Sequence, residues 1–331
     1  MTLTHKIYQE LFSASEYEKQ QISKRYDIEK QYIIYAVERA SGIRHLYFCI
    51  NQNELDSIPK CNGIEIGVVQ LPEYAVGTYF CDLAQSHGSE AYIFETIVED
   101  IRAKIVEKPY VDATAVVSTT LYKWKEFFAK NKEILMSPER QQGLYGELRF
   151  LEELITLKGT KAVQCWTGCD YETHDFYVEK DAFEVKTTVS KAPYKMHISS
   201  EYQLDTNEVE GSLYVRFYAL RKSEASGEQL AEIVQRIRAT LVDNPHALSK
   251  FNDGLEEYGY FDAVSDRYIT GYSDRLEETF LVKEGFPRIT PQRLGVGVVN
   301  CVYDVLVESC RNFRIGKEEI KEIITGEKAN G

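Results

Sequence analysis

The sequence predicts a protein of the mixed α+β or α/β class, divided into two domains. The chain has 331 residues and is 44% hydrophobic, so it can bury a substantial core but is long for one compact unit. Its N-terminal part is rich in short β-branched runs, whereas a long amphipathic helix followed by a hairpin pattern begins nearer the middle. We therefore expect a mainly β domain over residues 1–108 and a second domain over residues 109–331.

The first domain is expected to open with a helix over residues 5–23. Alternating or β-branched runs follow it, separated by Gly, Asn and Pro, and such runs are typical of strands. Two helical stretches should then connect the domains. The strand-like runs are YIIYAVERA, IRHLYFCI, IEIGVVQL and GTYFCDLA, and the helical stretches are ETIVEDIRAKIVEK and TTLYKWKEFFAKNKEI.

The second domain should begin with a helix whose start is marked by Ser137-Pro138-Glu139. Serine is a common N-cap, proline fits the first helical position, and an acid in the first turn suits the helix dipole. This helix should reach about Lys158. After it we expect a loop at WTGCD, a strand at HDFYVE, a tight turn at EKDA, strands at FEVKTTV, KMHIS and LYVRFYAL, a helix at GEQLAEIVQRIRATL and a β-rich extension from Tyr268.

The charge of the chain argues against a protein that coats nucleic acid by charge alone. The net charge is −13, and the sequence pI is about 5.1. The acidity is uneven, because residues 251–284 hold nine acidic and three basic residues, whereas residues 213–238 hold five basic and three acidic ones. A basic groove for nucleic acid would therefore have to be local.

The composition also indicates a cytoplasmic protein without a membrane partner. No run approaches the roughly 18 apolar residues of a membrane span, and the opening MTLTHKIYQELF lacks the layout of a signal sequence. The cysteines form no CxxC pair, so we expect reduced thiols. Cys165, Cys169 and His174 do not match the usual spacing of zinc ligands. The seven cysteines are at positions 49, 61, 81, 165, 169, 301 and 310.

Two acids and a lysine are expected to converge on the hairpin of the second domain. Side chains alternate along a strand, so Glu184 and Lys186 of FEVKTT share one face. Asp175 lies at the start of the preceding strand, and a short hairpin would bring it beside them. Hydrolysis of a phosphodiester needs such a set, with oxygen ligands for Mg²⁺ and a cation near the nucleophile. The alternative is a surface hairpin with a weak Glu–Lys pair.

Glu147 favours the functional interpretation, because it falls within the apolar stripe of the preceding helix. At about 100° per residue, its side chain points between the directions of Leu151 and Leu154. A buried carboxylate costs several kcal/mol unless a partner compensates it. The alternative is a glutamate at the edge of the stripe that reaches water. The stripe is formed by Leu144, Leu148, Leu151, Leu154 and Ile155.

Several segments resemble a known family. GLYGELRFLEEL, HDFYVEKDAFEVKTT, HISSEYQLD and FPRITPQRL look like PD-(D/E)XK-motif proteins of unassigned function from bacterial restriction and phage-defence neighbourhoods. The resemblance covers roughly residues 110–315. It implies a restriction-endonuclease-like core, which consists of a helix, a three-stranded β-meander, a second helix and a fourth strand.

The resemblance also implies roles for individual residues. Glu147, Asp175 and Glu184 match the acids of the superfamily, which bind Mg²⁺, with Mn²⁺ as a substitute. Lys186 matches the lysine that positions the attacking water. One departure is His174, which stands where the motif has proline, and proline contributes only backbone shape there.

Further residues are candidates for substrate binding. Ser199, Ser200 and Gln203 lie where the superfamily passes from a strand to its second helix, and they are candidates for contact with a phosphate or with metal-bound water. Ser199 is equally well explained as a helix N-cap. Basic side chains near the site are candidate phosphate contacts, although each also suits an ordinary solvated charge. They are Lys191, Lys195, Arg216 and Arg221.

Together these features predict a metal-dependent endonuclease that cuts double-stranded DNA in restriction or phage defence. A catalytically silent DNA- or partner-binding subunit with the same fold is the main alternative, and a metal hydrolase of another substrate is a third. Cutting both strands favours a homodimer. The resemblance further implies a helicase-like ATPase and a DNA methyltransferase as partners.

Overall fold

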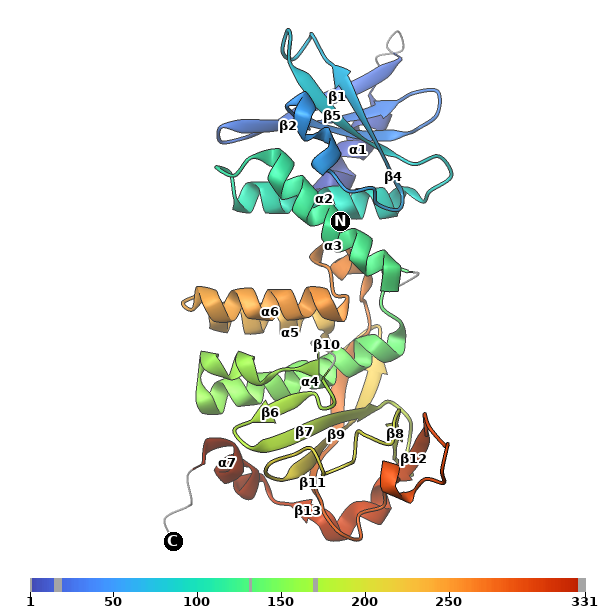
Figure 1. The fold of residues 1–331 in the computed structure, drawn as a ribbon, viewed down its shortest axis with the longest axis vertical. Coiled ribbons are helices and arrows are strands. Elements are labelled where there is room, and N and C mark those ends of the chain that lie inside the picture. Colours follow the sequence, from blue (N-terminus) through green and yellow to red (C-terminus); the bar gives the residue numbers. More distant parts are fainter. Residues whose placement is uncertain (1, 15–19, 131–132, 169–171, 327–331) are drawn as a thin grey trace. The chain divides into compact units, whose positions relative to one another are not determined.

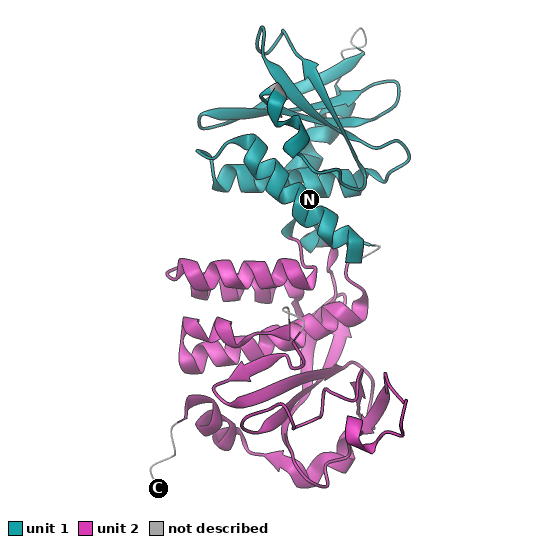
Figure 2. Cartoon of the chain, viewed as in Figure 1, with its two compact units in different colours: residues 1–134, 262–266 teal, residues 135–261, 267–331 magenta. Residues whose placement is uncertain are grey.

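The computed structural model describes residues 2–14, 20–130, 133–168 and 172–326. They form a mixed α+β fold with two compact units, coloured separately in Figure 2. Unit 1 comprises residues 1–134 and 262–266, and unit 2 comprises residues 135–261 and 267–331. The chain therefore divides after Ile134, later than the boundary expected after residue 108.

Unit 1 contains a five-stranded antiparallel sheet with the strand order β1-β2-β3-β5-β4. The expected opening helix is correct only over its first part. The QISKRYDI segment alternates between its two faces and pairs with the next strand, so it is a strand rather than the end of a helix. The elements are α1 (Leu3–Ser13), β1 (Gln21–Ile28), β2 (Gln31–Glu38), β3 (Arg44–Cys49), η1 (Gln52–Ser57), β4 (Ile64–Gln70) and β5 (Tyr79–Gln85).

The two expected connecting helices are part of unit 1. They are α2 (Ala91–Glu107) and α3 (Ala113–Lys130), which pack against each other and against β3. Each buries an apolar stripe, and Trp124 of α3 donates its indole N–H to Asp100 Oδ2 of α2 at 2.8 Å. Because this burial ties both helices to the sheet, the domain boundary follows α3 instead of preceding it.

Unit 2 is built around the predicted long helix α4 (Pro138–Lys158). The Ser137 side chain accepts the N–H of Arg140, as expected for an N-cap, and all five residues of the predicted apolar stripe are buried. Helix α4 packs on the sheet strand β7 and on three further helices, η2 (Thr160–Cys165), α5 (Leu230–Leu241) and α7 (Lys317–Thr325) (Figure 1). The other helices are α6 (Pro245–Tyr258), η4 (Asp262–Arg267), which begins in unit 1, η5 (Pro291–Arg293) and η6 (Val307–Phe313).

The main sheet of unit 2 has the order β10-β11-β9-β7-β6, with β13 also paired to β11. Strands β7 and β9 are parallel, and the other pairs are antiparallel. The tail is therefore not an extension, because β11 is an interior strand of this sheet. The strands are β6 (Phe176–Val178), β7 (Asp181–Thr188), β9 (Leu213–Ser223), β10 (Glu228–Gln229), β11 (Gly271–Val282) and β13 (Arg314–Ile315).

The expected three-stranded meander is wrong in its third member. Strand β8 (Lys195–Ile198) pairs with β12 (Tyr303–Leu306) in a separate two-stranded ribbon. Met196 and Ile198 are buried against the main sheet, while the alternate residues face outward, so the ribbon covers the sheet instead of extending it. The expected helix between β8 and β9 is also absent from the described residues, where turns at 201–204 make this connection.

The two faces of the main sheet have different partners. On one face, α4 approaches β7 so closely that a Cβ on Gly146 would lie 2.2 Å from Thr187 Cγ2. On the other face, Ala182, Val215 and Phe217 join the core under the β8–β12 ribbon. Glu184 and Lys186 alternate with Val185 and Thr187, so they belong to the ribbon face.

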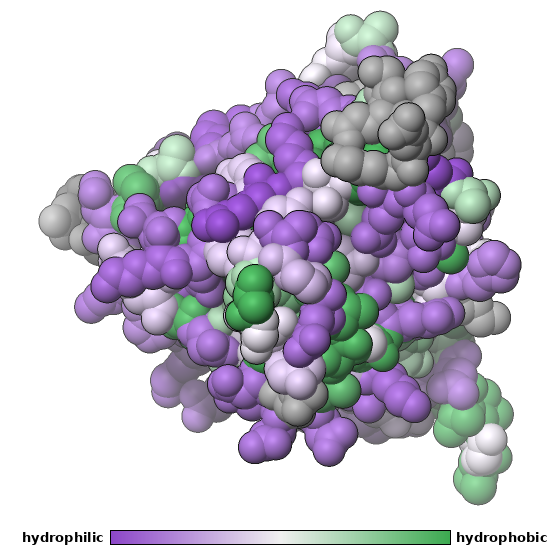
Figure 3. Space-filling model, turned by 90° about the horizontal axis from the view of Figure 1, so that it is seen from above, coloured by the Kyte–Doolittle hydropathy of each residue, from purple (hydrophilic) through white to green (hydrophobic). Residues whose placement is uncertain are grey.

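The surface of the molecule is largely hydrophilic on the face shown in Figure 3, where hydrophobic residues gather only in small groups. Such small groups are usual on a protein surface and do not mark a docking area. Among the helices of the described residues, none is long and apolar enough to cross a membrane. The six described cysteines are all free, and Cys169 lies outside the described residues.

Candidate functional site

The candidate site lies where strand β6 separates from β7. The β6–β7 ladder joins Phe176–Val178 to residues 181–183, and Asp175 precedes it. Instead of a further backbone pair, the Asp175 Oδ2 atom accepts the Val185 N–H at 2.7 Å. The Asp175 carboxylate is thereby fixed at the edge of β7, beside the strand positions that carry Glu184 and Lys186.

Glu184 and Lys186 form a buried ion pair on β7. Only 1% of the Glu184 side chain and 12% of the Lys186 side chain are exposed, and Lys186 Nζ lies 2.8 Å from Glu184 Oε1. Lys186 Nζ also donates to Gln203 Oε1 at 2.9 Å. The predicted alternation is therefore correct, but the alternative of a solvated surface pair is wrong, because the ribbon and the 201–204 turns cover this face.

Glu147 reaches the same place from helix α4. Its carboxylate is buried, accepts the Trp166 indole N–H at 2.8 Å and accepts a hydrogen bond from the Tyr258 hydroxyl. Burial is the largest cause of a raised pKa at Glu147, the two hydrogen bonds and Lys186 lower it, and the negative charge of Glu184 raises it, which leaves the pKa at about 7. The alternative in which this glutamate reaches water from the edge of the stripe is wrong.

The acids at this site repel one another. The pKa of Asp175 is raised well above its ordinary value, first by burial and then by Glu184 and Glu147, while Lys186 and the Val185 N–H lower it. The structure thus brings together all four residues that the sequence singled out. One lysine does not neutralise three carboxylates, so full ionisation of the acids would leave an excess of negative charge at the site.

A glycine beside the acids leaves room for a ligand. A Cβ on Gly168 would lie 2.8 Å from Glu147 Oε2 and 3.1 Å from Asp175 Oδ1. The N–H groups of Thr167 and Gly168 both donate to the Asp175 carbonyl, at 2.9 and 3.0 Å, and hold this loop against the strand. Only a residue without a side chain keeps the space between the two carboxylates open.

The donor atoms fit a divalent cation. Carboxylate oxygens are the ligands that Mg²⁺ and Mn²⁺ prefer, and Glu184 Oε2 is buried with no hydrogen-bond partner in the described part of the chain. A cation would also relieve the repulsion among the acids. Within the same residues, no three His, Cys, Asp or Glu side chains already lie close enough to enclose an ion. The structure therefore presents the ligand atoms but not an assembled coordination shell.

The HISSEYQLD segment contributes one predicted residue directly. Gln203 Oε1 accepts the Lys186 ammonium at 2.9 Å and the Ser199 N–H at 2.9 Å, so it orients the lysine. Ser199 is exposed and begins no helix, so the N-cap alternative is wrong. Ser200 is half-buried in the same turn.

The predicted basic contacts have different positions. Lys191 and Arg221 are exposed, and Lys195 is exposed on β8 with its ammonium 3.7 Å from Asp304. Lys191 and Lys195 belong to the segment between β7 and the turn that carries Gln203. They remain candidates for contact with a phosphate.

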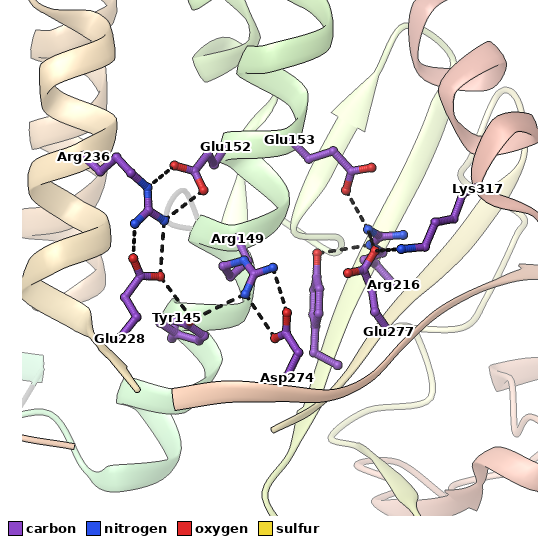
Figure 4. A network of polar contacts seen from close by, with 11 residues as sticks. Tyr145, Arg149, Glu152, Glu153, Arg216, Glu228, Arg236, Asp274, Glu277 and Lys317 are labelled. Atoms are coloured by element: carbon purple, nitrogen blue, oxygen red, sulfur yellow. Dashed lines mark hydrogen bonds and ion pairs between the residues drawn. The ribbon is translucent and has the colours of Figure 1, made fainter. Parts of the chain in front are cut away.

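Arg216 is not a phosphate contact. It pairs in register with Val185, so it lies on the α4 face, opposite to Glu184 and Lys186. Its guanidinium is buried and lies 2.6 Å from Glu153 and 2.5 Å from Glu277 (Figure 4). Arg216 therefore contributes to the basic character of residues 213–238 from within an internal network, and not from an exposed groove.

Two residues of the site were not predicted. Trp166 belongs to a segment expected to be a loop, and Tyr258 lies at the end of α6, far from the motifs in sequence. Both donate hydrogen bonds to Glu147. The tryptophan in WTGCD gave a weak signal, because a large aromatic residue in a polar loop is usually buried. Tyr258 gave no signal.

The raised pKa of Glu147 predicts a pH-dependent stability. The folded state keeps this proton up to about pH 7, whereas the unfolded chain releases it near its ordinary pKa of 4.5. The contribution of Glu147 to stability without metal should therefore fall by up to about 3 kcal/mol as pH rises from 4.5 to 7, and then change no further. Glu147→Gln should remove this component. Urea unfolding of both proteins in EDTA between pH 5 and 8 measures it.

The difference between the two proteins reports the Glu147 charge, both through its own ionisation and through its effect on the pKa of Asp175. Glu147→Leu is not an equivalent test, since it also removes the acceptor of the hydrogen bonds from Trp166 and Tyr258, and losing a hydrogen bond of a buried donor costs about 1–3 kcal/mol. Parallel pH profiles for wild type and Glu147→Gln would show that the carboxylate ionises normally and is not buried among the other acids.

Comparison with known proteins finds one matching family. The model of the family described as "Putative PD-(D/E)XK family member, (DUF4420)" matches residues 4–308, which span both units. Comparison of the chain with curated proteins gives no match, and comparison with solved structures gives none either. The match covers more of the chain than the resemblance seen in the sequence, because it includes the N-terminal unit. The chain therefore belongs to this family.

Proposed function

We propose that this protein is a divalent-metal-dependent endonuclease that hydrolyses phosphodiester bonds of double-stranded DNA. The observation that carries the proposal is the meeting of Glu147, Asp175 and Glu184 around the Lys186 ammonium, in a chain of the PD-(D/E)XK family. Three buried carboxylates beside one lysine are costly to keep together, and a catalytic metal site is a physical reason for keeping them.

The carboxylates of Asp175 and Glu184 are the proposed ligands of Mg²⁺ or Mn²⁺, and Glu147 the proposed third. Bound there, the ion would polarise the phosphate and lower the pKa of a bound water. The Val185 N–H fixes the Asp175 carboxylate, and the Trp166 indole fixes that of Glu147. These bonds hold the ligands in one orientation before the metal arrives.

Lys186 is the proposed positioner of the attacking water. Its ammonium is held between Glu184 Oε1 and Gln203 Oε1, at 2.8 and 2.9 Å, and one of its three N–H donors remains for a water or a phosphate oxygen. Fixed donors near developing charge stabilise a transition state without reorganisation. Gln203 is therefore a positioning residue that acts through the lysine.

Binding to duplex DNA by the isolated chain should be weak and dependent on salt. The net charge is −13, and we propose that phosphate contacts come from a few side chains near the site, namely Lys191 and Lys195 with Ser199 and Ser200. For the two lysine contacts, affinity should fall roughly 12-fold when monovalent salt rises fourfold. Fluorescence anisotropy with a labelled duplex in EDTA measures the slope of log affinity against log salt.

Lys191→Ala and Lys195→Ala should each lower the slope of log affinity against log salt by about one. Lys180→Ala is the control and should leave this slope unchanged, because Lys180 lies on the β6–β7 turn and its side chain is 74% exposed. Tight binding that is insensitive to salt would contradict the proposed contacts.

The direct test of the function is incubation of the purified chain with supercoiled plasmid and Mg²⁺ or Mn²⁺. Conversion to nicked or linear DNA, stopped by EDTA, is expected. Plasmid binding without cleavage would indicate the silent DNA-binding subunit instead. Neither binding nor cleavage would favour a metal hydrolase of another substrate.

The biological setting and the assembly are also proposals. We propose a cytoplasmic role in restriction or phage defence, based on the family resemblance. A homodimer would place one site on each DNA strand. On the same resemblance, we propose that a helicase-like ATPase and a DNA methyltransferase act with this chain.

A further inference from the structure

His174 is a buried residue for which the proposed mechanism has no role. It stands directly before Asp175, and only 1% of its side chain is exposed. Neither ring nitrogen has a hydrogen-bond partner in the described part of the chain. An imidazole always has at least one N–H donor, and leaving such a group buried and unpaired costs about 1–3 kcal/mol. This position therefore calls for a specific partner.

The ring faces an equally unpaired oxygen. His174 Nδ1 lies 3.6 Å from Glu184 Oε2, the one carboxylate oxygen of that residue not taken by Lys186. The separation is too long for a direct hydrogen bond. Two metal–ligand bonds of about 2.1 Å each can span up to about 4.2 Å, so both atoms are within reach of a single ion. Two unpaired ligand atoms thus face each other across a gap of suitable size.

We propose that His174 Nδ1 and Glu184 Oε2 bind the same divalent ion, which makes the centre a mixed nitrogen and oxygen site. This inference rests on the proposed metal-dependent function and adds a ligand to it. Imidazole suits the transition metals, whereas Mg²⁺ prefers an all-oxygen shell. The site should therefore bind Mn²⁺ more tightly than Mg²⁺.

The position of His174 in the chain supports this role. The Thr167 side chain donates to the His174 carbonyl at 3.0 Å, and the ring lies edge-on to Tyr177 with centroids 5.8 Å apart. The backbone and the ring are thus both held, although neither ring nitrogen is engaged. Proline at this position would have no ligand atom, so the histidine changes the donor set of the site.

Electron spin-echo spectroscopy of bound Mn²⁺ tests the proposal directly, because it detects a nitrogen bonded to the ion. Wild-type protein with one equivalent of Mn²⁺ should show ¹⁴N modulation. Protein that carries ¹⁵N-labelled histidine should show ¹⁵N modulation instead. His174→Gln should show no ¹⁴N modulation, and its affinity for Mn²⁺ should fall at least about tenfold. Its affinity for Mg²⁺ should change much less. His197→Gln, at an exposed histidine on β8, is the matched control and should change neither.

The outcomes separate this inference from the proposed function. Mn²⁺ that binds in a manner dependent on Asp175 but shows no ¹⁴N modulation would overturn the role of His174 and leave the metal site intact. Mn²⁺ that does not bind, or binds equally well to Asp175→Asn, would overturn both. The wild-type spectrum decides the question even if His174→Gln folds poorly.

Discussion

Lys186→Ala is expected to lower DNA cleavage by about 10²–10⁴-fold, the usual loss when a positioned proton-transfer or charge-stabilising group is removed. The Lys186 ammonium lies between Glu184 and Gln203. Among the described residues, the other basic group within ion-pairing distance of Glu184 is His174, which carries a charge only when it is protonated. Lys180→Ala removes an equal charge from an exposed turn and should retain full activity. Initial rates of plasmid nicking measure both.

The same substitution should also destabilise the protein. The alternation of FEVKTT suggests a lysine on a strand surface, but only 12% of this side chain is exposed, and it neutralises a carboxylate that is 1% exposed. Removing one member of a buried pair costs about 3–5 kcal/mol. The double variant Lys186→Ala/Glu184→Gln should recover stability without recovering cleavage. An active Lys186→Ala protein would remove the lysine from the mechanism.

Asp175→Asn and Glu184→Gln should each weaken Mn²⁺ binding by at least about 100-fold and abolish cleavage, because each removes a charged ligand from a site with few others. Without metal, Asp175→Asn should be more stable than wild type at pH 7. The raised pKa of Asp175 means that its ionisation opposes folding as pH rises above the ordinary value. Calorimetric titration and thermal melts with and without Mn²⁺ measure these effects.

The control for these substitutions is Glu172→Gln, which removes a charge from an exposed residue near Asp175. It should keep wild-type metal affinity and the wild-type rise in melting temperature with Mn²⁺. A ligand stabilises only the state that binds it, so Asp175→Asn should lose that rise. Equal metal affinity in Asp175→Asn and wild type would place the ion elsewhere.

Features set by local pattern were predictable from the sequence. The N-cap at Ser137, the stripe of α4 and the alternation that pairs Glu184 with Lys186 depend on residues close together in the chain. The anomaly of Glu147 within that stripe was visible for the same reason. These signals suffice to bring the four candidate residues to one hairpin and its preceding helix.

Features set by long-range pairing were not predictable. Strand β8 pairs with β12, more than a hundred residues later, and no local pattern distinguishes this from pairing with β7. Tyr258 reaches Glu147 only because α6 packs against η2. Arg216 looked like a phosphate contact, but its partners Glu153 and Glu277 come from α4 and β11. Charge counts along the sequence do not show which charges are buried together.

Anomalous diffraction from crystals grown with Mn²⁺ shows whether the buried acids beside β6 and β7 form a metal site. We expect a peak in contact with the carboxylates of Asp175 and Glu184, which is lost in Asp175→Asn crystals. A well-ordered site without such a peak at saturating Mn²⁺, or a peak bound only by other residues, would contradict the proposed metal site.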